Sequence, residues 1–513
     1  MEKQKQQTAG MLQRVRDFRY ALILEGAAVG AAGGLVSVLF RWLLQQADTL
    51  REQVGHWLTL YPAALLIVLA ALLATALLVA ALLKREPYIS GSGIPQVEAE
   101  MRGAISQKWW RVLVMKLTGG LLSIGAGLSL GREGPSIQLG AMAGKGGARL
   151  SHRNPVEEKM LITCGASAGL AAAFNAPLAG VLFSLEELHK NFSTDVLLSA
   201  MSASITADFI SSTLFGLGPV FDFSGLQMMP LNQYWTILLL GIGLGLIAAL
   251  YVFCIGKSQT LYAKIPDLRW RLIVPFLLAG VLLIVAPELL GGGHALVEAV
   301  CRDQLWQALL LLFAGKFLFS MISFGSGAPG GIFLPMLVLG AVAGSICSQW
   351  LQLGGIPVAT ANFVILGMAG LFAAIVRAPL TGIILISEMT GSLSHLLTLS
   401  LVSLTAVITV DLLRCQPVYD LLLNRLLDKE KAPASTRKVL IDIPVSHGAM
   451  ICGKTPSDLD VFSGGLIVAI QRHDQEIVPH GDTVIQAGDV LTLLCEEADY
   501  SRIHSRIEHL CKN

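Results

Sequence analysis

Three short segments of this sequence combine glycine and proline in the same order, and each lies between long apolar stretches. They are Gly91-Ser92-Gly93-Ile94-Pro95, Gly131-Arg132-Glu133-Gly134-Pro135 and Gly331-Ile332-Phe333-Leu334-Pro335. Glycine lets the backbone open and approach a ligand closely, and proline suits the first turn of the helix that follows. Helix N-termini carry unpaired N–H groups and the positive end of the helix dipole. Three such ends that converge would bind a small, dehydrated anion.

The side chains of these segments suggest how the anion is held and released. Ser92 can offer its hydroxyl to the anion, or it can cap the helix that follows. Ile332 and Phe333 would act through their backbone N–H groups, while their apolar side chains exclude water. Glu133 brings a carboxyl group. An ionised Glu133 would occupy an anion site itself, and a protonated Glu133 would leave that site to the anion. The alternative is a structural ion pair between Glu133 and its neighbour Arg132.

The composition places most of the chain in lipid. Of 513 residues, 54% are hydrophobic and 14% are charged, whereas soluble globular proteins carry about 25% charged residues. The net charge of +1 argues against a nucleic-acid partner. The eight cysteines show no spacing typical of a metal site, so we expect no metal and no cofactor.

Long apolar segments predict a multi-pass membrane protein. Basic residues precede the first apolar run, Tyr20 to Leu44, which predicts a first membrane helix with a cytoplasmic N-terminus. Several later segments are interrupted by Gly or Pro, or are too short for the roughly 20 residues of a full span. Broken backbone at that depth lines a cavity or is buried in protein, so these segments mark the working part. They lie near 61–83, 109–130, 160–188, 195–216, 232–256, 271–290, 305–323, 332–352, 361–388 and 397–413.

The two halves of the membrane part repeat each other. At an offset of 200 positions, Lys116 is matched by Lys316 and 139–144 by 339–344. The offset then becomes 202, where 176–180 matches 378–382. Broken segments at corresponding places in two halves indicate a transport site at the repeat interface. We expect the repeats to be inverted, because corresponding helix ends then meet from both sides at the midplane.

The composition changes after Leu413, where a charged stretch leads into a soluble segment. Short apolar or alternating runs in this segment predict strands, and its end predicts a closing helix, so we expect one small α+β domain. The patterns Gly453-Lys454-Thr455, Pro479-His480-Gly481-Asp482-Thr483 and Ala487-Gly488-Asp489 resemble those of the TrkA C-terminal (RCK-C) ligand-binding module. The expected strands are Lys438–Ile443, Gly465–Ile470 and Val490–Leu494, and the expected helix is Tyr500–Leu510.

The membrane part, from about residue 20 to 425, resembles the CLC family of chloride channels and proton/chloride exchangers. The resemblance rests on the three pentapeptides and on the stretch Gly169–Gly180. It implies an all-α polytopic membrane protein of two inverted repeats with broken and re-entrant helices. It also implies a homodimer in the lipid membrane with a complete anion pathway in each subunit, and chloride and protons as the transported species.

The resemblance assigns roles to further residues. Tyr419, in Pro417-Val418-Tyr419, matches the tyrosine that donates a second hydroxyl to the central chloride, although a lone Tyr near a membrane end is also typical of an interface anchor. Glu187 matches the internal proton-transfer glutamate of the exchangers, although Glu186 and Glu187 could instead be a solvated helix end. Ser92 favours chloride over fluoride. The remaining charges of interest are interpreted as structural ion-pair partners: Glu98, Lys116, Arg377 and Glu388.

The predicted function is therefore exchange of protons for chloride, with Glu133 as the gating glutamate and Glu187 as the internal proton-transfer group. A passive chloride channel of the same fold is the alternative. A membrane-embedded enzyme is disfavoured, because the sequence has no His-Glu-x-x-His and no Gly-x-Ser-x-Gly with a histidine partner. A potassium channel or transporter subunit is disfavoured because the Thr-Val-Gly-Tyr-Gly filter is missing and helix N-termini repel cations.

We divide the chain into four parts on this basis. These are a cytoplasmic N-terminal segment (1–19), a transmembrane domain (20–425, with repeats at about 20–216 and 232–413), a linker (426–436) and a TrkA-C-like regulatory domain (437–513). The last part implies a small-molecule ligand on the cytosolic side. This module, together with the lack of an organellar presequence, predicts a multi-pass protein of the prokaryotic inner membrane with both termini in the cytoplasm.

Overall fold

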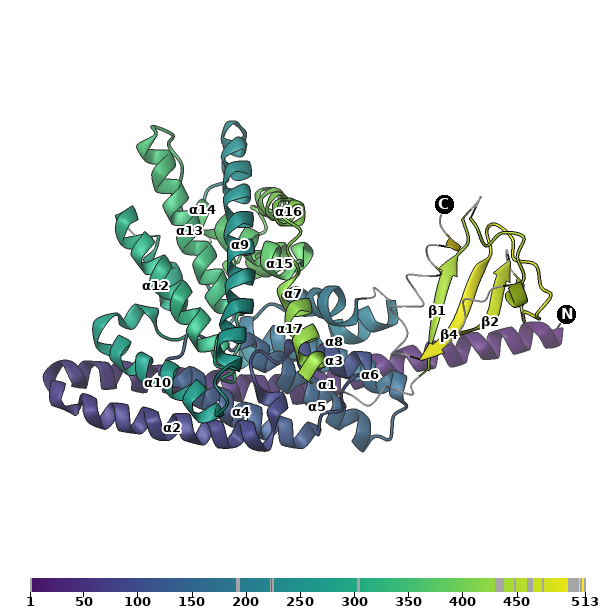
Figure 1. Cartoon of the computed structure of the whole chain (residues 1–513), viewed down its shortest axis with the longest axis horizontal. Helices are drawn as coiled ribbons and strands as arrows, with labels where there is room; N and C mark the ends of the chain where they lie inside the picture. The colour runs from purple at the N-terminus through teal and green to yellow at the C-terminus, as the bar shows by residue number, and fades with distance from the viewer. Residues whose placement is uncertain are drawn as a thin grey trace. The chain divides into compact units, whose positions relative to one another are not determined.

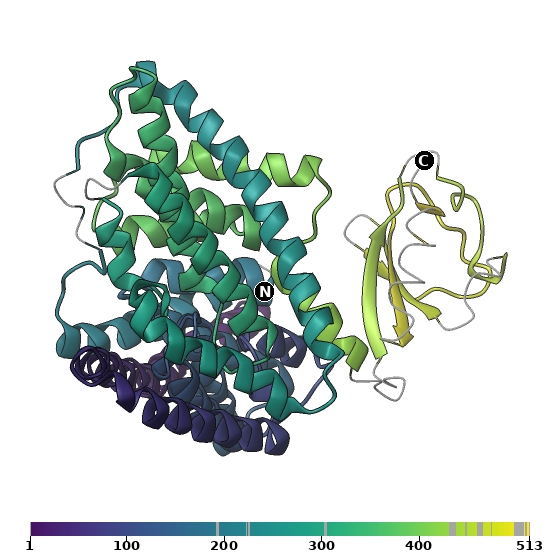
Figure 2. The same cartoon turned by 60° about the vertical axis from the view of Figure 1, so that its left-hand side comes forward.

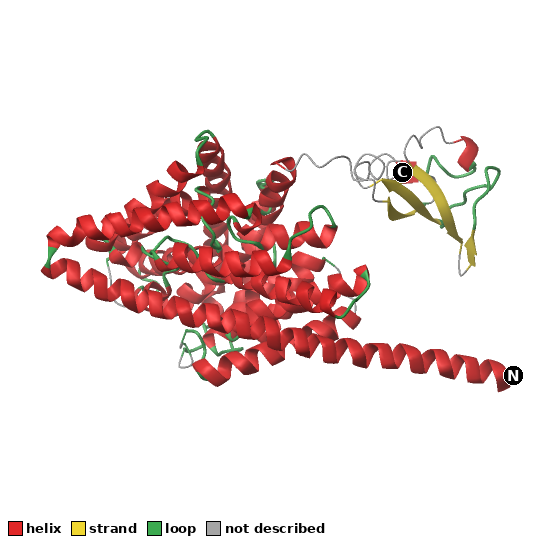
Figure 3. Ribbon diagram, turned by 90° about the horizontal axis from the view of Figure 1, so that it is seen from below, coloured by secondary structure: helices red, strands yellow, loops and turns green. Residues whose placement is uncertain are grey.

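The computed structural model separates into two compact units, Met1–Leu426 and Leu427–Asn513, whose elements are labelled in Figure 1. The larger unit is helical, and the smaller one contains a β-sheet (Figure 3). The residues described are 2–190, 194–221, 223, 226–301, 305–429, 438–446, 449–458, 465–472, 475–496, 507 and 510–511.

The helices of the larger unit fall into two successive sets (Figure 1). The first set is α1 (Glu2–Leu60), α2 (Leu65–Arg85), α3 (Ile94–Arg102), α4 (Trp109–Gly125), α5 (Glu133–Leu150), α6 (Pro155–Phe174), α7 (Pro177–Phe183) and α8 (Thr194–Phe215), with a π-helical turn at Ser184–His189 after α7. The second set is α9 (Tyr234–Ala263), α10 (Leu268–Val285), α11 (His294–Ala299), α12 (Trp306–Gly325), α13 (Phe333–Leu353), α14 (Thr360–Val376), α15 (Pro379–Thr390) and α16 (Leu396–Leu412), followed by α17 (Val418–Lys429).

The helices confirm a multi-pass membrane protein. Among the described residues, seven helices are long and apolar enough to cross a membrane. The first span, Leu22–Leu60, is longer than the predicted run of Tyr20 to Leu44. The helix continues past Leu44 although charged residues follow. Arg51 and Asp48 lie one turn apart and form an ion pair at 2.7 Å, which is compatible with a continuous helix.

Two predicted apolar segments are each broken into two helices at equivalent positions of the repeats. Asn175, after α6, and Arg377, after α14, adopt left-handed backbone conformations with φ of 51° and 71°. A left-handed residue ends a helix. The proline two positions later disfavours helical geometry for the residue before it and suits the first turn of a new helix. Short helices α7 and α15 therefore begin as separate elements.

The two sets of helices are inverted repeats that meet at the glycines of the second and third pentapeptides. The N–H of Gly131 donates to the carbonyl of Gly331 at 2.7 Å, and the N–H of Gly331 donates to the carbonyl of Gly131 at 2.7 Å. This is an antiparallel bridge, and its two residues are equivalent positions of the repeat. A reciprocal antiparallel pair of equivalent residues requires a local two-fold relation, which confirms the inverted arrangement. Figure 2 shows the two repeats from the side, one purple to blue and the other teal to green.

The repeat extends to buried lysines, which correct one expectation. Lys116 donates to the carbonyls of Ile89 and Gly91 at 2.9 and 2.7 Å, and Lys316 donates to those of Leu289 and Gly291 at 2.9 and 2.7 Å. Lys116 was predicted to be in an ion pair, but its ammonium satisfies backbone oxygens at the end of a loop instead. Buried polar groups need a partner, and the carbonyls next to a glycine turn supply it.

Of the other three predicted structural charges, two form ion pairs in the described part of the chain, and the third is held by backbone groups. Glu98 contacts Arg102 at 2.6 Å, and Arg377 pairs with Asp411. Glu388 instead accepts hydrogen bonds from backbone N–H groups of Leu178 and Ala179. An acidic side chain stabilises the N-terminus of a helix, and Glu388 does so for α7.

Small residues let the helices that follow the filter segments pack closely. Gly140 of α5 and Gly165 of α6 face each other so tightly that a Cβ on either would overlap the carbonyl of the other. Gly340 of α13 and Gly367 of α14 form the equivalent contact in the second repeat. Close backbone approach at small residues is a common basis of helix packing in membranes. It fixes the helices whose N-termini carry the second and third pentapeptides.

The smaller unit is a four-stranded antiparallel sheet with strand order β1-β4-β2-β3 (Figure 3). Its strands are β1 (Lys438–Pro444), β2 (Gly465–Arg472), β3 (Gln475–Ile477) and β4 (Val490–Glu496). The three predicted strands form, and β3 was not predicted because it has only three residues, two of them polar. The larger part of the expected closing helix, and linker residues 430–436, lie outside the described residues.

An ion pair joins the end of β2 to the residue that precedes β4. Arg472 at the end of β2 makes two 2.8 Å contacts with the carboxylate of the buried Asp489 just before β4. This hydrogen-bonded pair raises the pKa of Arg472. Asp489 also accepts from the N–H of Gln486 at 2.8 Å. The bidentate geometry orders the turn that leads into β4.

Candidate functional site

The first pentapeptide ends in a helix start with an open backbone. Gly91 and Gly93 have φ of 61° and 97°, which glycine adopts without strain. Gly93 is the N-cap of α3, and Pro95 lies in its first turn. Ser92 therefore does not cap α3: it is buried, and its Oγ has no hydrogen-bond partner among the described residues. The helix-cap alternative for Ser92 is wrong.

The second pentapeptide places a carboxyl group at the first residue of α5. Glu133 is fully buried. Its Oε2 accepts from the backbone N–H of Leu334 at 3.4 Å, and its Oε1 has no partner among the described residues. Arg132 is the N-cap of this helix, and the ion pairs found in the described part of the chain do not join it to Glu133. The carboxylate is thus directed at the backbone of the third pentapeptide.

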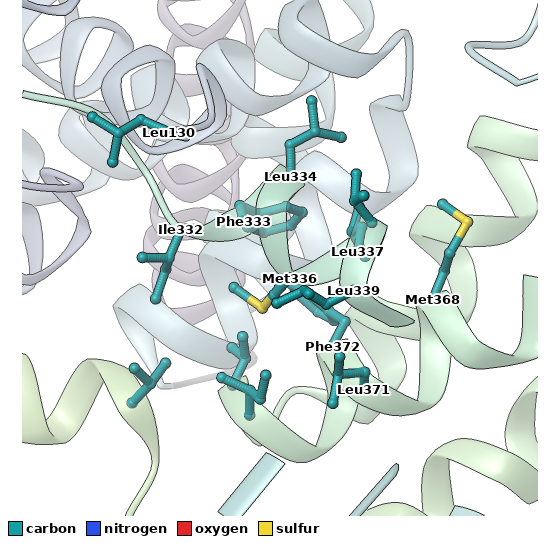
Figure 4. Packing of buried hydrophobic residues seen from close by; sticks show 14 of the residues in the cluster. Leu130, Ile332, Phe333, Leu334, Met336, Leu337, Leu339, Met368, Leu371 and Phe372 are labelled. Carbon is teal, nitrogen blue, oxygen red and sulfur yellow. The ribbon is translucent and has the colours of Figure 1, made fainter. Parts of the chain in front are cut away.

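The third pentapeptide begins α13 in the same way. Ile332 is the N-cap and Phe333 the first residue of that helix, so their N–H groups have no partner within it. Both side chains are buried. Figure 4 shows Ile332, Phe333 and Leu334 in succession at this helix start, and Phe372 of α14 nearby. The Phe333 and Phe372 rings lie 4.6 Å apart. The apolar side chains therefore exclude water while the amide groups remain available.

The three helix starts converge. A Cβ built on Gly134 would overlap Ser92 Oγ and would lie 2.7 Å from its carbonyl oxygen. A Cβ on Gly331 would lie 3.2 Å from the backbone nitrogen of Gly134. The first segment thus touches the second, and the second touches the third. The absence of side chains at Gly134 and Gly331 makes this approach possible, as the sequence indicates.

Tyr419 approaches the same place from α17. Its side chain is fully buried, and its ring packs edge-on to Phe183 at 6.4 Å, which in turn lies 6.1 Å from Phe333. The Tyr419 hydroxyl lies close to Ser92, yet neither oxygen has a hydrogen-bond partner among the described residues. The interface-anchor alternative does not fit a tyrosine buried at this position, because anchors lie at the membrane surface.

The site therefore gathers three buried oxygens that lack protein partners: Ser92 Oγ, Tyr419 Oη and Glu133 Oε1. Buried polar atoms are normally hydrogen-bonded. Two hydroxyls that can donate, beside helix N-termini with free N–H groups, match the requirements of an anion. The fit to a metal is poor: within the described residues, no group of three or more His, Cys, Asp and Glu side chains could hold one.

Glu187 lies at a second position, on the π-helical turn after α7. Its side chain is 5% exposed, and its Oε1 has no partner among the described residues. Charged groups of Lys190, Glu98, Asp420 and Glu186 surround it. It is therefore not a solvated helix end. Tyr419 is within electrostatic reach of both Glu133 and Glu187, so it lies where the two acidic groups can be connected.

Two charged residues around Glu187 were not singled out from the sequence. Lys190 contacts Glu98 at 2.9 Å and Asp420 at 3.1 Å. Two features of the sequence could have pointed to them. Asp420 directly follows Tyr419, and Lys190 lies three residues after Glu187. The contact between them spans more than two hundred residues of chain, and no local pattern reveals it.

Two family models match this chain. The model described as voltage gated chloride channel matches residues 75–411, and the model described as TrkA-C domain matches residues 440–507. The first match covers the region that carries all three pentapeptides and Glu187, and the second covers the four-stranded sheet except the first two residues of β1.

Curated relatives match over most of their length. A protein of Klebsiella pneumoniae named H(+)/Cl(-) exchange transporter ClcA is 35% identical over 441 residues, which cover 81% of this chain and 91% of the relative. A protein of the same name from Vibrio cholerae is 36% identical over 431 residues, which cover 80% and 91%.

Solved structures share the fold. A structure described as a slow cyanobacterial Cl-/H+ antiporter superposes with a TM-score of 0.77 at 32% identity and covers 80% of this chain and 99% of that one. A CLC-type fluoride/proton antiporter superposes with a TM-score of 0.64 at 24% identity, covering 78% and 97%.

Proposed function

This chain belongs to the voltage-gated chloride channel family, and from that premise we propose that it exchanges protons for chloride across a membrane. The observation that carries the proposal is the position of Glu133, whose carboxylate accepts from the N–H of Leu334 within the group of Ser92, Tyr419 and the α13 helix start. A carboxylate and a chloride ion require the same N–H and O–H donors. One acidic side chain can therefore link the occupancy of the anion site to a proton.

The exchange follows from competition at these donors. Ionised Glu133 takes the amide groups at the start of α13 and excludes chloride from them. Protonation removes the negative charge that these helix ends stabilise, so the side chain leaves and chloride replaces it. When chloride departs, the carboxyl group releases its proton and returns. Ser92 and Tyr419 hold the central chloride by their hydroxyls, and Ile332 and Phe333 hold it by their N–H groups.

Glu187 is proposed as the inner station of the proton. Its burial on the π-helical turn, among charged neighbours, supports this role, since π-helical turns often occur at functional sites. The two curated relatives are named exchange transporters, which favours exchange over a passive channel. A passive channel needs no buried carboxyl group at this position.

Purified protein in liposomes tests the proposal. A chloride gradient alone should drive protons uphill in the wild type, and Glu187→Ala should stop proton movement while chloride flux continues. Glu186→Gln is the matched control, because Glu186 is the adjacent acid but binds backbone groups at the start of α15, and it should retain coupled flux. Chloride flux that moves no protons under any gradient would establish the passive channel instead.

We also propose a homodimer. Apolar side chains remain exposed on α7, α8, α15 and α16, which pack against one another in one group. Among them are Leu178, Phe209, Leu380 and Leu404. In a membrane, exposed apolar groups face either lipid or protein, and we propose that these face a second copy of the same surface. Light scattering of the detergent-solubilised protein should give twice the subunit mass, and tryptophan at both Leu380 and Leu404 should give monomers. A monomeric wild type would contradict the dimer.

The sheet unit is proposed to regulate transport by binding a small molecule in the cytosol. The match to the TrkA-C domain supports this role. Deleting residues 437–513 should leave basal exchange intact and remove any response to added nucleotides or cyclic dinucleotides. Loss of all transport would instead make the unit structural. The boundaries of the parts also belong to this proposal: a transmembrane domain that ends at 425, a linker at 426–436 and a regulatory domain that starts at 437.

The location is proposed as the inner membrane of a prokaryotic cell, with both termini in the cytoplasm. Fusions of a fluorescent protein and of a periplasmic phosphatase to the C-terminus test this. Fluorescence with no phosphatase activity is expected, and the reverse result would contradict the orientation.

A further inference from the structure

Lys190 joins three segments of the larger unit. It follows the π-helical turn Ser184–His189 in a left-handed conformation, with φ of 51°. Its Nζ lies 2.9 Å from Glu98 Oε1 on α3 and 3.1 Å from Asp420 Oδ1 on α17. The side chain is 40% exposed, whereas that of Glu98 is 1% exposed. One ammonium group thus links a buried acid to the helix that carries Tyr419.

Each of these segments carries a group of the proposed transport route. Helix α3 begins directly after Ser92 and Gly93. The π-helical turn holds Glu187, and α17 holds Tyr419 immediately before Asp420. The contacts of Lys190 therefore fix the two hydroxyl-bearing segments relative to the acidic group on the π-helical turn. No other described cation bridges these same three segments.

The local charge balance depends on the same lysine. The charged groups that face Glu187 are Glu98 from α3, Glu186 and Lys190 from the π-helical turn and its end, and Asp420 from α17. Three of these four are acidic. Arg102 offsets part of the charge of Glu98 at 2.6 Å, but it lies on α3 itself, and its ion pair among the described residues stays within that helix. Removing Lys190 would leave Asp420 without its partner and would raise the negative potential at Glu187.

Burial alone would lower the pKa of Lys190, but its hydrogen bond to Glu98 and the surrounding acids raise it. Lys190 is therefore charged at physiological pH. The ion pairs it makes are partly shielded from solvent, and such pairs are less screened by salt than those at the surface.

We infer that Lys190 is a positioning residue that holds Tyr419 and Ser92 in register with Glu187 and thereby couples chloride binding at the two hydroxyls to proton transfer at Glu187. This inference rests on the proposed function. In this inference, Lys190 itself transfers no proton. The ammonium acts through the acids of α3 and α17, so its removal should alter both the ratio of protons to chloride and the pH range of proton flux.

The test compares Lys190→Met with Arg102→Met, the matched control that removes a cation from the same Glu98 without loosening α17. Lys190→Met should lower the ratio of proton to chloride flux at least about twofold and weaken chloride binding about threefold or more. Its proton flux should persist to higher internal pH, because a more negative environment keeps Glu187 protonated longer. Arg102→Met should match the wild type in the flux ratio and in chloride affinity.

Further variants keep the test decisive. Lys190→Arg should restore the wild-type ratio, because it keeps the charge. Asp420→Asn breaks the contact between Lys190 and α17 from the α17 side, and it should also lower the ratio of proton to chloride flux. It therefore tests the inference even if Lys190→Met folds poorly. An unchanged ratio, affinity and pH profile in Asp420→Asn and in a folded Lys190→Met would overturn the inference while wild-type exchange stands. A wild type that moves chloride without protons would overturn the proposed function itself.

Discussion

Glu186 and Glu388 each bind the start of the helix that belongs to the other repeat. Glu388 accepts from the N–H groups of Leu178 and Ala179 at 3.0 and 2.8 Å, at the beginning of α7. Glu186 accepts from the N–H groups of Leu380 and Thr381 at 3.4 and 2.9 Å, at the beginning of α15. The two short helices therefore hold each other through equivalent carboxylates.

Replacing either carboxylate should destabilise the unit without changing its transport chemistry. Glu186→Ala and Glu388→Ala each remove the capping acceptor of a helix start, and loss of such a cap costs about 1 kcal/mol and up to about 2. The free energy of unfolding, followed by circular dichroism in detergent, should fall by this amount. Glu288→Ala, at an exposed position, should have no effect. Equal stability of all three variants would contradict the reciprocal caps.

Adding one methyl group at Gly134 should block the site. The new Cβ would overlap Ser92 Oγ and approach the Ser92 carbonyl, so the first and second segments must separate. We expect Gly134→Ala to lower chloride flux at least about tenfold, since a small displacement of positioned groups costs this much. Gly147→Ala is the control on the same helix, because its Cβ would meet the nearest atom, Val29 Cγ2, at an ordinary 3.5 Å. Normal flux in Gly134→Ala would show that these segments do not form the route.

Replacing each of the two equivalent lysines should distinguish a loss of stability from a loss of chloride affinity. Lys316→Met removes the side-chain donor of the Leu289 and Gly291 carbonyls, and Lys116→Met removes that of the Ile89 carbonyl. The Gly91 carbonyl loses Lys116 as well but keeps the N–H of Gly330 at 3.0 Å. Each buried carbonyl left without a donor costs about 1–3 kcal/mol of unfolding free energy. Only Lys116 supports the loop ahead of Ser92, so only Lys116→Met should also weaken chloride binding. Calorimetry and chemical unfolding measure the two effects. Chloride affinity that falls equally in both variants would contradict this assignment.

The two hydroxyls should contribute separately to chloride affinity. Ser92→Ala and Tyr419→Phe each remove one donor, worth about 1 kcal/mol or a factor of about five in the dissociation constant. Isothermal titration with chloride measures the change. Tyr262→Phe, which removes a phenolic hydroxyl on α9, is the control and should bind like the wild type. Unchanged affinity in Tyr419→Phe would remove this side chain from the site.

Local residue patterns were enough to predict the helix starts of the site. The conformations of Gly91 and Gly93 and the capping position of Ile332 follow from glycine and proline placement alone. The equivalence of Lys116 and Lys316 follows from the internal repeat. These features depend on neighbours in sequence or on a constant offset, so the sequence predicts them.

Contacts between distant segments could not be predicted in the same way. Lys116 was expected to pair with an acid and instead donates to backbone carbonyls. The approach of Tyr419 to Ser92 was expected only from the family resemblance. The link between Lys190 and Asp420 depends on how α17 packs, and tertiary packing of this kind leaves no periodic signal in the chain.

The most direct test of the account records chloride and proton flux together in liposomes that contain Glu133→Ala. If ionised Glu133 competes with chloride for the amide groups of α13, its removal should leave chloride flux intact, end proton flux and make chloride flux independent of pH. Proton movement that still follows the chloride gradient in this variant would contradict the account.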